Sequence, residues 1–466
     1  EAVAVLGDSR HTPQVCARCW GTAAPDHTRD TRVLHGGRWV CTPGASRCIT
    51  SRYTKTKKTS LVDTRPMLPV GPEVSQTFWR SPPFQVLVRS MLSPLRRRPA
   101  SAMRRGVLSR GFRALVADKA STEGPASKML EFASVADLPR QDPDADVEVA
   151  VTHTTLNYKD AMIVNGERGV VKDFPIVGGI DYAGVVSKSS SPLWREGDAV
   201  VLTGNKAGQF FDGGYAERAA CRAEWLVAPP AEFSLAQSMT IGTAGVTAAM
   251  CVHYLERFGE VRPSHGPVLV TGAAGGLGQL AIALLAARGF EVVASTGRGA
   301  TLTKHLEALG ASKVIGRLEP ELDKRGQPRP LGTQKWAGVV DSVGGSTLAT
   351  ALAQTRYRGA IASPGVAGGG VLETSVYPLI LRGVRVLGVD QTMPWDLEGY
   401  PRDSERWAEW RAERQQMWRL LAELLDPEKL ELVRAGTIGL EDIVEYAPRV
   451  IKAEVAGRLL VEVAVE

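Results

Sequence analysis

Cysteine is scarce in this chain of 466 residues, which has six in all. The part beyond residue 110 has two, Cys221 and Cys251, which stand apart from each other. Two isolated cysteines favour a reducing compartment over a disulfide framework. The chain also lacks an apolar run of the roughly 20 residues that a membrane-spanning helix needs. We therefore expect no membrane partner.

Acidic residues are missing from a long stretch near the front, where none occurs between Glu73 and Asp118. Residues 1–111 hold 19 Lys and Arg against 6 Asp and Glu, a balance of +13, whereas residues 112–466 hold 37 against 44, a balance of −7. The net charge of +6 therefore comes from the front of the chain. A mildly acidic body argues against nucleic acid as its partner.

Residues 1–110 lack the sustained periods that indicate strands or helices. From Met91 onward this segment is rich in Arg, contains Ser and has no acid, which is the composition of an organelle transit peptide. We interpret it as a targeting or disordered leader, with Met91 or Met103 as the true start. We expect a mitochondrial or other organelle location, with the cytoplasm as the alternative. A nucleic-acid-binding tail is a further interpretation.

Four of the six cysteines lie in this leader, at Cys16, Cys19, Cys41 and Cys48. A Cys-x-x-Cys pair followed by a second pair can hold zinc. The second pair here has six residues between its members, which is wider than the usual ligand spacing. We therefore do not favour a zinc site in the leader.

The best-defined motif is a strand–turn–helix–strand unit over Val268–Arg298. Gly275 and Gly278 fit the second and third glycines of a G-x-G-x-x-G turn, and Ala273 holds the first place. Such a turn lets a pyrophosphate approach the backbone N–H groups at a helix N-terminus. The unit therefore predicts a dinucleotide site, the alternative being a tight turn used for packing.

An acid is missing from the end of the second strand of this unit, where NAD-binding proteins usually hold the ribose 2′-hydroxyl. The chain has Ser295, Thr296, Gly297 and Arg298 there. Hydroxyls and a guanidinium suit a 2′-phosphate, because Arg offers a fork of charged donors. We therefore predict NADPH as the cofactor. The alternative for Arg298 is a solvated surface charge.

Two architectures follow each other along the body, which we assign to the α/β class. Short strands with glycine turns, at roughly ten-residue spacing, indicate a β-barrel-like domain. Alternating strands and helices then indicate a doubly wound parallel sheet of the Rossmann type. The expected divisions are a β-barrel domain over 111–235, a Rossmann domain over 236–382, and over 383–466 the end of the Rossmann sheet and a strand, Gly457–Val463, that returns to the first domain.

Several short boxes carry a family resemblance. They are Asn157-Tyr158-Lys159-Asp160, Gly179-Ile-Asp-Tyr-Ala-Gly184, Gly242-Thr-Ala-Gly245, the turn Val270–Gly278, Trp336-Ala-Gly338, Leu352-Ala-Gln-Thr-Arg-Tyr357 and Leu381-Arg-Gly-Val-Arg385. With them, residues 112–463 resemble the zinc-independent medium-chain dehydrogenase/reductases, in particular the NADPH-dependent acrylyl-CoA reductases and their quinone-oxidoreductase-like relatives. The resemblance implies a GroES-like catalytic domain beside the Rossmann domain, and a homodimer.

The resemblance also implies the cofactor contacts. Those at the pyrophosphate would be Ala274, Gly275, Gly276, Leu277 and Gly278; those at the 2′-phosphate Thr296, Gly297, Arg298 and Arg317; and those nearer the nicotinamide Tyr158, Val366, Ile380 and Gln391. Three features depart from the family. Gln391 stands where Ser is more frequent, Gly178 replaces a Pro, and the segment Trp395–Glu413 is longer.

Zinc ligands are absent from the body of the chain. It has no four-cysteine lobe, and where zinc alcohol dehydrogenases carry a Gly-His-Glu box this chain has Gly179-Ile180-Asp181. Without a ligand set, no Lewis acid is available to polarise an alcohol. We therefore predict no metal, and reduction of an activated C=C bond rather than oxidation of an alcohol.

The predicted reaction is NADPH-dependent reduction of a short 2-enoyl-CoA, acrylyl-CoA to propanoyl-CoA. The cofactor would supply a hydride to the β-carbon, and a proton would add at the α-carbon. Asn157 and Tyr158 are the predicted polar groups near the thioester oxygen, where enolate charge develops, and Asp160 is a further catalytic candidate. A quinone or general enone reductase of the same fold is the alternative, and a non-enzymic NADPH-binding sensor or scaffold is another.

Five charged residues in or near these boxes have less specific expectations. Lys159 and Asp160 are neighbours of opposite charge and are expected to form a local ion pair. Asp181 is expected to cap a turn. Arg382 and Arg385 would meet the CoA phosphates or lie on the surface. The tryptophan-rich helix expected over Trp407–Leu425 would serve the core or a subunit contact.

Overall fold

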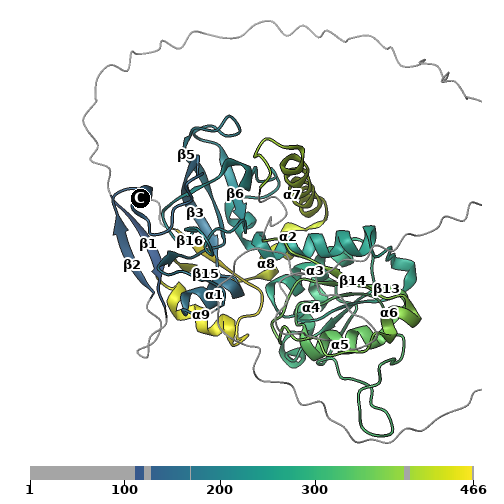
Figure 1. Cartoon of the computed structure of the whole chain (residues 1–466). Coiled ribbons are helices and arrows are strands. Elements are labelled where there is room, and N and C mark those ends of the chain that lie inside the picture. Colours follow the sequence, from purple (N-terminus) through teal and green to yellow (C-terminus); the bar gives the residue numbers. More distant parts are fainter. Residues whose placement is uncertain (1–110, 120–126, 168, 393–398, 464–466) are drawn as a thin grey trace, which may run out of the picture. The chain divides into compact units, whose positions relative to one another are not determined.

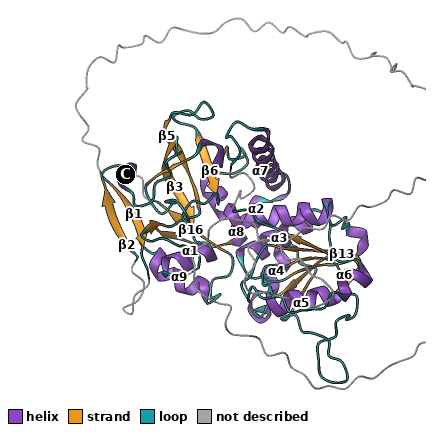
Figure 2. Cartoon of the chain, in the orientation of Figure 1, coloured by secondary structure: helices purple, strands orange, loops and turns teal. Residues whose placement is uncertain are grey.

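The structure is a computed structural model that describes residues 111–119, 127–167, 169–392 and 399–463 (Figure 1). The predicted leader and its four cysteines lie outside these residues, as does part of the segment Trp395–Glu413. The described residues form the two architectures that the sequence predicts (Figure 2). The α/β fold class is therefore confirmed.

The first domain is built from short, mainly antiparallel strands. Its larger sheet has the order β15-β16-β3-β5-β6-β8, with β7 paired to β3, and its smaller sheet has the order β2-β1-β4. The strands are β1 (Phe112–Ala117), β2 (Lys128–Phe132), β3 (Val147–Thr155), β4 (Ile176–Val177), β5 (Asp181–Ser189), β6 (Ala199–Thr203), β7 (Arg218–Cys221), β8 (Leu226–Val227), β15 (Arg434–Gly439) and β16 (Arg458–Glu462). Along β3, Val147, Val149 and Val151 alternate into the core, as a half-buried strand requires.

The second domain is a parallel six-stranded sheet in the order β11-β10-β9-β12-β13-β14. Its strands are β9 (Val268–Val270), β10 (Val292–Ser295), β11 (Lys313–Ile315), β12 (Trp336–Val340), β13 (Thr355–Ser363) and β14 (Arg385–Gly388), and its helices are α3 (Gly276–Ala287), α4 (Gly299–Leu309), α5 (Gly345–Gln354) and α6 (Tyr377–Arg382). Val268 packs in the core that includes α3, whereas its neighbour Leu269 packs with Leu348 of α5. Helices therefore cover both faces of the sheet, as predicted.

A long helix, α2 (Leu235–Arg257), contacts elements of both domains. Ser234 begins it with a capping box, in which the Ser234 hydroxyl accepts from the backbone nitrogen of Gln237 at 3.1 Å. The helix is interrupted at Gly242, whose φ of +48° lies outside the helical region. In length and apolarity α2 could cross a membrane, but 72% of its most apolar window is buried inside the protein. Packing in the core therefore accounts for its apolar residues.

The C-terminal part contributes α7 (Glu405–Leu424), α8 (Pro427–Val433) and α9 (Ile443–Ile451). Met417, Trp418 and Leu421 of α7 are buried in the same core as α2, so the core interpretation of the tryptophan-rich helix is confirmed. The final strand β16 pairs antiparallel with β3 and parallel with β15. Strand β16 thus completes a sheet together with β3, a strand about 300 residues earlier in the sequence.

Candidate active site

The glycine turn between β9 and α3 has the shape that a pyrophosphate needs. Gly272 has a φ of +59°, and the backbone nitrogen of Gly275 donates to the Gly272 carbonyl at 2.9 Å. A Cβ at Gly278 would lie 2.5 Å from that carbonyl oxygen, so glycine is required for α3 to pack this close. The N-cap residue Gly275 makes no side-chain cap, which leaves the first N–H groups of α3 available for an anion. These residues fit the predicted cofactor.

Thr296, Gly297 and Arg317 lie at one edge of the parallel sheet. Thr296 and Gly297 follow β10 and Arg317 follows β11, and these two strands are parallel neighbours, so their carboxyl ends meet. A Cβ at Gly297 would lie 2.8 Å from Arg317 Nε, which shows that the Arg317 guanidinium lies directly against Gly297. The structure therefore brings together a hydroxyl, a backbone without a side chain and a cation at the predicted 2′-phosphate position.

Arg298 is the N-cap residue of α4 and lies beside the same edge of the parallel sheet. Its backbone nitrogen donates to Thr296 Oγ1 at 3.1 Å, and its Nη2 donates to the carbonyls of Val455 at 3.3 Å and Ala274 at 3.4 Å. Partial burial lowers the pKa of its guanidinium. Arg298 is thus held between the glycine turn and the segment before β16, and it is not a freely solvated charge.

Asn157 and Asp160 form a capping box at the start of α1 (Tyr158–Val164). Asp160 Oδ2 accepts from the backbone nitrogen of Asn157 at 3.0 Å and from its Nδ2 at 2.8 Å, and Oδ1 accepts from the backbone nitrogen of Ile180 at 2.9 Å. Burial, and secondarily the charge of Asp181, raise the pKa of the Asp160 carboxyl to about 6. Asp160 is fully buried, so the contacts that the structure gives it hold the backbone in place.

Asn157 uses both ends of its amide on other buried groups. Its Nδ2 donates to Asp181 Oδ2 at 3.0 Å as well as to Asp160, and its Oδ1 accepts from Arg458 Nη1 at 2.7 Å. Asn157 therefore lies within a buried polar network. Tyr158, the next residue, has 42% of its surface exposed, and it is the member of the box whose side chain is open to a ligand.

Lys159 departs from the expectation of a local ion pair with Asp160, which was wrong. Its Nζ donates to Gln209 Oε1 at 3.2 Å and to Thr392 Oγ1 at 3.3 Å, because the neighbouring carboxylate turns inward to cap the helix. Burial lowers the pKa of Lys159, with Asp160 and Asp390 acting in the opposite direction. Lys159 thus connects α1 to the segment after β14.

Asp181 was expected to cap a turn, and this too was wrong. Its carboxylate is completely buried and accepts from Thr243 twice, from the backbone nitrogen at 2.8 Å and from Oγ1 at 2.5 Å. Arg458 Nη2 lies 3.9 Å from Asp181 Oδ2. A Cβ at Gly242 would lie 2.7 Å from the same oxygen, so the break in α2 makes room for this carboxylate.

Arg382 and Arg385 both form hydrogen bonds to backbone carbonyls of the fold. Arg382 donates to the carbonyls of Gly332, Ala353 and Thr355. Arg385 donates to the Gly259 carbonyl at 2.7 Å and forms an ion pair with Glu260 at 2.7 Å. Arg382 therefore holds the ends of neighbouring segments together, and the ion pair of Arg385 with Glu260 lies at the surface. A contact of either arginine with CoA phosphates stays a prediction.

The residues predicted nearer the nicotinamide occupy two different settings. Val366 and Ile380 are 65% and 71% exposed, so they are open to a ligand or a partner. Gln391 is buried, and its Nε2 donates to Thr203 Oγ1 at 2.9 Å. Its Oε1 is buried with no hydrogen-bond partner among the described residues. The longer Gln391 side chain is thus accommodated where Ser is more frequent, because its amide nitrogen bonds Thr203 of β6.

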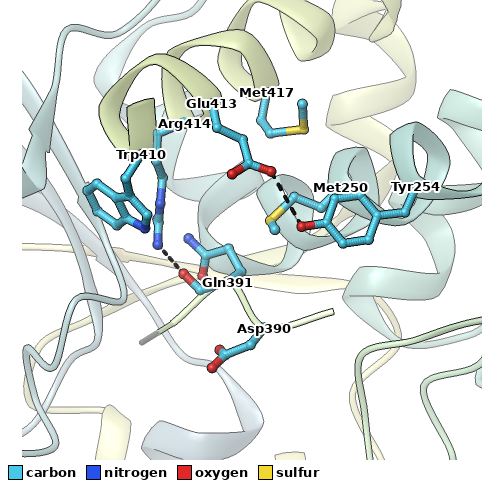
Figure 3. A pocket seen from close by; sticks show the side chains of 8 residues that line it. All are labelled: Met250, Tyr254, Asp390, Gln391, Trp410, Glu413, Arg414 and Met417. Atoms are coloured by element: carbon cyan, nitrogen blue, oxygen red, sulfur yellow. Dashed lines mark hydrogen bonds between the residues drawn. The ribbon is translucent and has the colours of Figure 1, made fainter. Parts of the chain in front are cut away.

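Gln391 also lines a pocket of about 220 Å³ between α2 and α7 (Figure 3). The lining residues are Met250, Tyr254, Asp390, Gln391, Trp410, Glu413, Arg414 and Met417. Arg414 donates to the Gln391 carbonyl and stacks 4.4 Å from the Trp410 ring centroid, and burial lowers its pKa to about 10. Trp410 and Glu413, which belong to the long segment Trp395–Glu413, therefore form one wall of the pocket beside Gln391.

Sequence reasoning missed the central position of Arg458 and the pairing of Asp181 with Thr243. Arg458 lies 301 residues beyond its partner Asn157, and no local pattern reports such a distance. A weak signal was present, since Arg458 directly precedes the apolar run Leu459–Val461, and a charged residue is unusual at a buried position.

Comparison with known proteins places these features in a family. A family model for the alcohol dehydrogenase GroES-like domain matches residues 143–231, and one for zinc-binding dehydrogenase matches residues 276–402. The acrylyl-CoA reductase AcuI of Ruegeria pomeroyi is 41% identical over 353 residues, which are 76% of this chain and 99% of that protein. The chain belongs to the medium-chain dehydrogenase/reductase family. The resemblance drawn from the sequence is therefore confirmed.

Two further members of the family are informative. The putative quinone oxidoreductase YhfP of Bacillus subtilis is 37% identical, over 75% of this chain and 98% of that protein. The crystal structure of the YhdH oxidoreductase from Salmonella enterica in complex with NADP is 37% identical, has a TM-score of 0.66, and is matched over 76% of this chain and 100% of that one. In the part of this chain that the structure describes, no group of three or more His, Cys, Asp and Glu residues could hold a metal ion.

Proposed function

We propose that this protein reduces the C=C bond of a short 2-enoyl-CoA with NADPH, and that acrylyl-CoA, converted to propanoyl-CoA, is its substrate. The observation that carries the proposal is a complete dinucleotide cradle next to the Asn157–Asp160 box, in a chain 41% identical to an acrylyl-CoA reductase over nearly all of that protein. The open glycine turn and the Arg317 guanidinium against Gly297 support NADPH rather than NADH.

The proposed step balances as a two-electron reduction. NADPH, when bound, supplies a hydride to the β-carbon, the C=C π bond breaks, and its electron pair moves toward the thioester carbonyl as an enolate. A proton from water then adds at the α-carbon, and NADP⁺ leaves. A group that donates a hydrogen bond to the enolate oxygen lowers the barrier, because the charge there is larger in the transition state than in the substrate.

Tyr158 is the residue that we assign to that oxygen. Its side chain is open to solvent, whereas Asn157 and Asp160 are committed to the network beneath it. The capping box therefore fixes the backbone that presents the Tyr158 hydroxyl. In this proposal Asn157 and Asp160 act as positioning residues, and Tyr158 makes the contact with substrate or cofactor.

The experiment is oxidation of NADPH by the full chain, followed by its absorbance, with acrylyl-CoA, crotonyl-CoA or a benzoquinone as acceptor and with NADH in parallel. Fast turnover with NADPH and acrylyl-CoA supports the proposal. Turnover with the quinone alone replaces it by the quinone reductase that YhfP suggests. Tight NADPH binding without turnover of any acceptor replaces it by a sensor or scaffold.

A matched pair of variants tests the role of the tyrosine. Tyr158→Phe removes only the hydroxyl, and we expect kcat to fall by roughly 100-fold, the size of effect seen when one donor to an oxyanion is lost. Tyr357→Phe changes a tyrosine that is 62% exposed near the amino end of β13, whereas ligands of such sheets bind at the carboxyl ends, and we expect it to leave kcat unchanged. Equal activity of the two variants would remove Tyr158 from the mechanism.

We also propose that the protein forms a homodimer through the β14 edge of the Rossmann sheet. Among the described strands β14 is the last in the order of that sheet, so no described strand pairs with its outer side. Large apolar side chains are exposed close to it in sequence: Val366, Val371, Leu372, Val376, Tyr377, Leu379, Ile380, Leu381 and Val386. A second copy, pairing β14 with β14, would cover both the open edge and these side chains.

A further inference from the structure

Arg458 occupies a position that joins the cofactor turn to the catalytic box. It is the first residue of β16, and it is 4% exposed. The residue before it, Gly457, donates its backbone nitrogen to the Ala274 carbonyl at 3.1 Å and forms a bridge with Gly275. The start of β16 is therefore attached to the glycine turn itself.

The stem of Arg458 lies against the first residue of α3. A Cβ built at Gly276 would come within 2.3 Å of Arg458 Cδ, so the absence of a side chain at Gly276 is what admits the stem. Any shift of Gly276 toward or away from a bound pyrophosphate changes the space that the stem occupies, since packed interiors transmit displacement.

The guanidinium of Arg458 binds groups of the first domain and of α2. Nη1 donates to Asn157 Oδ1 at 2.7 Å, Nη2 donates to Thr155 Oγ1 at 2.9 Å, and Nε donates to the Thr240 carbonyl at 3.1 Å. These acceptors belong to the start of α1, to β3 and to α2. One planar group thus sets the orientation of Asn157, the residue that precedes Tyr158.

We propose that Arg458 is a positioning residue, which transmits the position of the cofactor turn at Gly275–Gly276 to the Tyr158 backbone through Asn157. NADPH binding would then order the start of α1 in addition to any contact that Tyr158 makes directly. This inference rests on the proposed binding of NADPH. Arginine suits the role because its fork holds three acceptors at once, whereas the single nitrogen of lysine cannot reproduce that geometry.

Arg458→Lys is the principal test, because it keeps a positive charge beside the buried Asp181 carboxylate. The measurement is hydrogen exchange of the full chain, followed by mass spectrometry, with and without saturating NADPH and without acyl-CoA. In the unaltered protein we expect NADPH to slow exchange in peptides covering both residues 272–278 and residues 157–164. In the variant we expect NADPH still to slow exchange at residues 272–278 but no longer to slow it at residues 157–164.

Two results would overturn the inference. Slowing at 157–164 that persists in Arg458→Lys shows that direct contact alone orders α1. Loss of slowing at both peptides shows that Arg458 acts on the turn alone. Absence of slowing at 272–278 in the unaltered protein contradicts the proposed cofactor binding, and so it is distinguishable from failure of the coupling.

A second variant and a control guard against loss of folding. Asn157→Ser breaks the same path at its other end, and we expect the same division between the two peptides. Arg222→Lys alters another arginine that binds a buried carboxylate, Asp142, away from the turn. We expect it to change neither exchange pattern. With acrylyl-CoA present, Arg458→Lys should lower kcat by roughly 10-fold, the effect of losing about one hydrogen bond to a charged group, while KM for NADPH changes much less. An equal change in both would count against coupling.

Discussion

Thr243 binds the buried carboxylate of Asp181 through two donors, its backbone nitrogen at 2.8 Å and its hydroxyl at 2.5 Å. The pair joins α2 to β5 directly after the break at Gly242. The Asp181 carboxylate also lies 3.9 Å from Arg458 Nη2 and is completely buried. If it loses one of the Thr243 donors, water cannot replace the lost hydrogen bond.

Thr243→Val should therefore destabilise the protein by about 1–3 kcal/mol, since it leaves a buried charged acceptor short of one hydrogen bond without changing the shape of the side chain. Thr303→Val is the matched control, because the Thr303 hydroxyl bonds only a carbonyl of its own helix at 2.7 Å. Urea unfolding measures both. Equal losses in the two variants would show that the bond to Asp181 contributes nothing of its own.

Arg317→Ala should weaken binding of NADPH and leave binding of NADH unchanged. The guanidinium lies against Gly297 at the predicted 2′-phosphate position, and a hydrogen bond to a charged group contributes about 1.5–3 kcal/mol, or roughly 10- to 150-fold in Kd. Titration by the fluorescence of the reduced nicotinamide gives both constants. Arg325→Ala, in the connection before β12, is the control, and parallel weakening of NADPH and NADH in Arg317→Ala would contradict the assignment.

Asp160→Asn should change how stability depends on pH. Burial raises the pKa of this carboxyl to about 6 from an ordinary value of 3.8, so between about pH 4 and pH 6 the folded protein binds more protons than the unfolded chain. The contribution of Asp160 to stability is therefore fully present below about pH 4 and is lost as the pH rises through about 6.

Asparagine does not titrate, so the difference in unfolding free energy between the unaltered protein and Asp160→Asn should decrease from pH 4 to pH 6. Urea midpoints taken at half-unit steps measure it. A difference that stays constant over that range would mean that the Asp160 carboxyl does not change its charge there.

The proposed dimer predicts that Val386→Glu yields monomers. The substitution places a charge on the β14 edge strand, where Val386 is 43% exposed. Leu322→Glu, at a residue 56% exposed in the connection between β11 and β12, is the control and should leave the dimer intact. Light scattering after gel filtration gives the masses. A dimer that survives Val386→Glu would require another interface.

Local patterns predicted the elements well where one segment carries its own signal. The strand–turn–helix–strand unit predicted over Val268–Arg298 is present as β9, α3 and β10, because its apolar runs are separated by glycines. The box at Asn157–Asp160 was recognised as polar but not as a helix start, although Asn and Asp three residues apart are a capping-box pattern. β2 and β15, which have few buried residues, gave no signal.

The sequence predicted which residues make up the candidate site but not the buried hydrogen bonds that connect them. The glycine turn and the residues after β10 are contiguous in sequence, so their role follows from their order. The partners of Asp181 and Arg458 come from segments 62 and 301 residues away, and only the folded chain shows that they meet. The bonds of Arg382 were missed for the same reason, since its carbonyl acceptors belong to other segments.

The attachment of Gly457 to the glycine turn also bears on synthesis. A ribosome delivers β16 after every other element that the structure describes, yet β16 borders β3 and holds the turn before α3. A nascent chain can therefore form most of the parallel sheet before Gly457 is present to pair with the glycine turn. Competence to hold the cofactor would therefore arise only after residues 457–462 have emerged and paired with the turn.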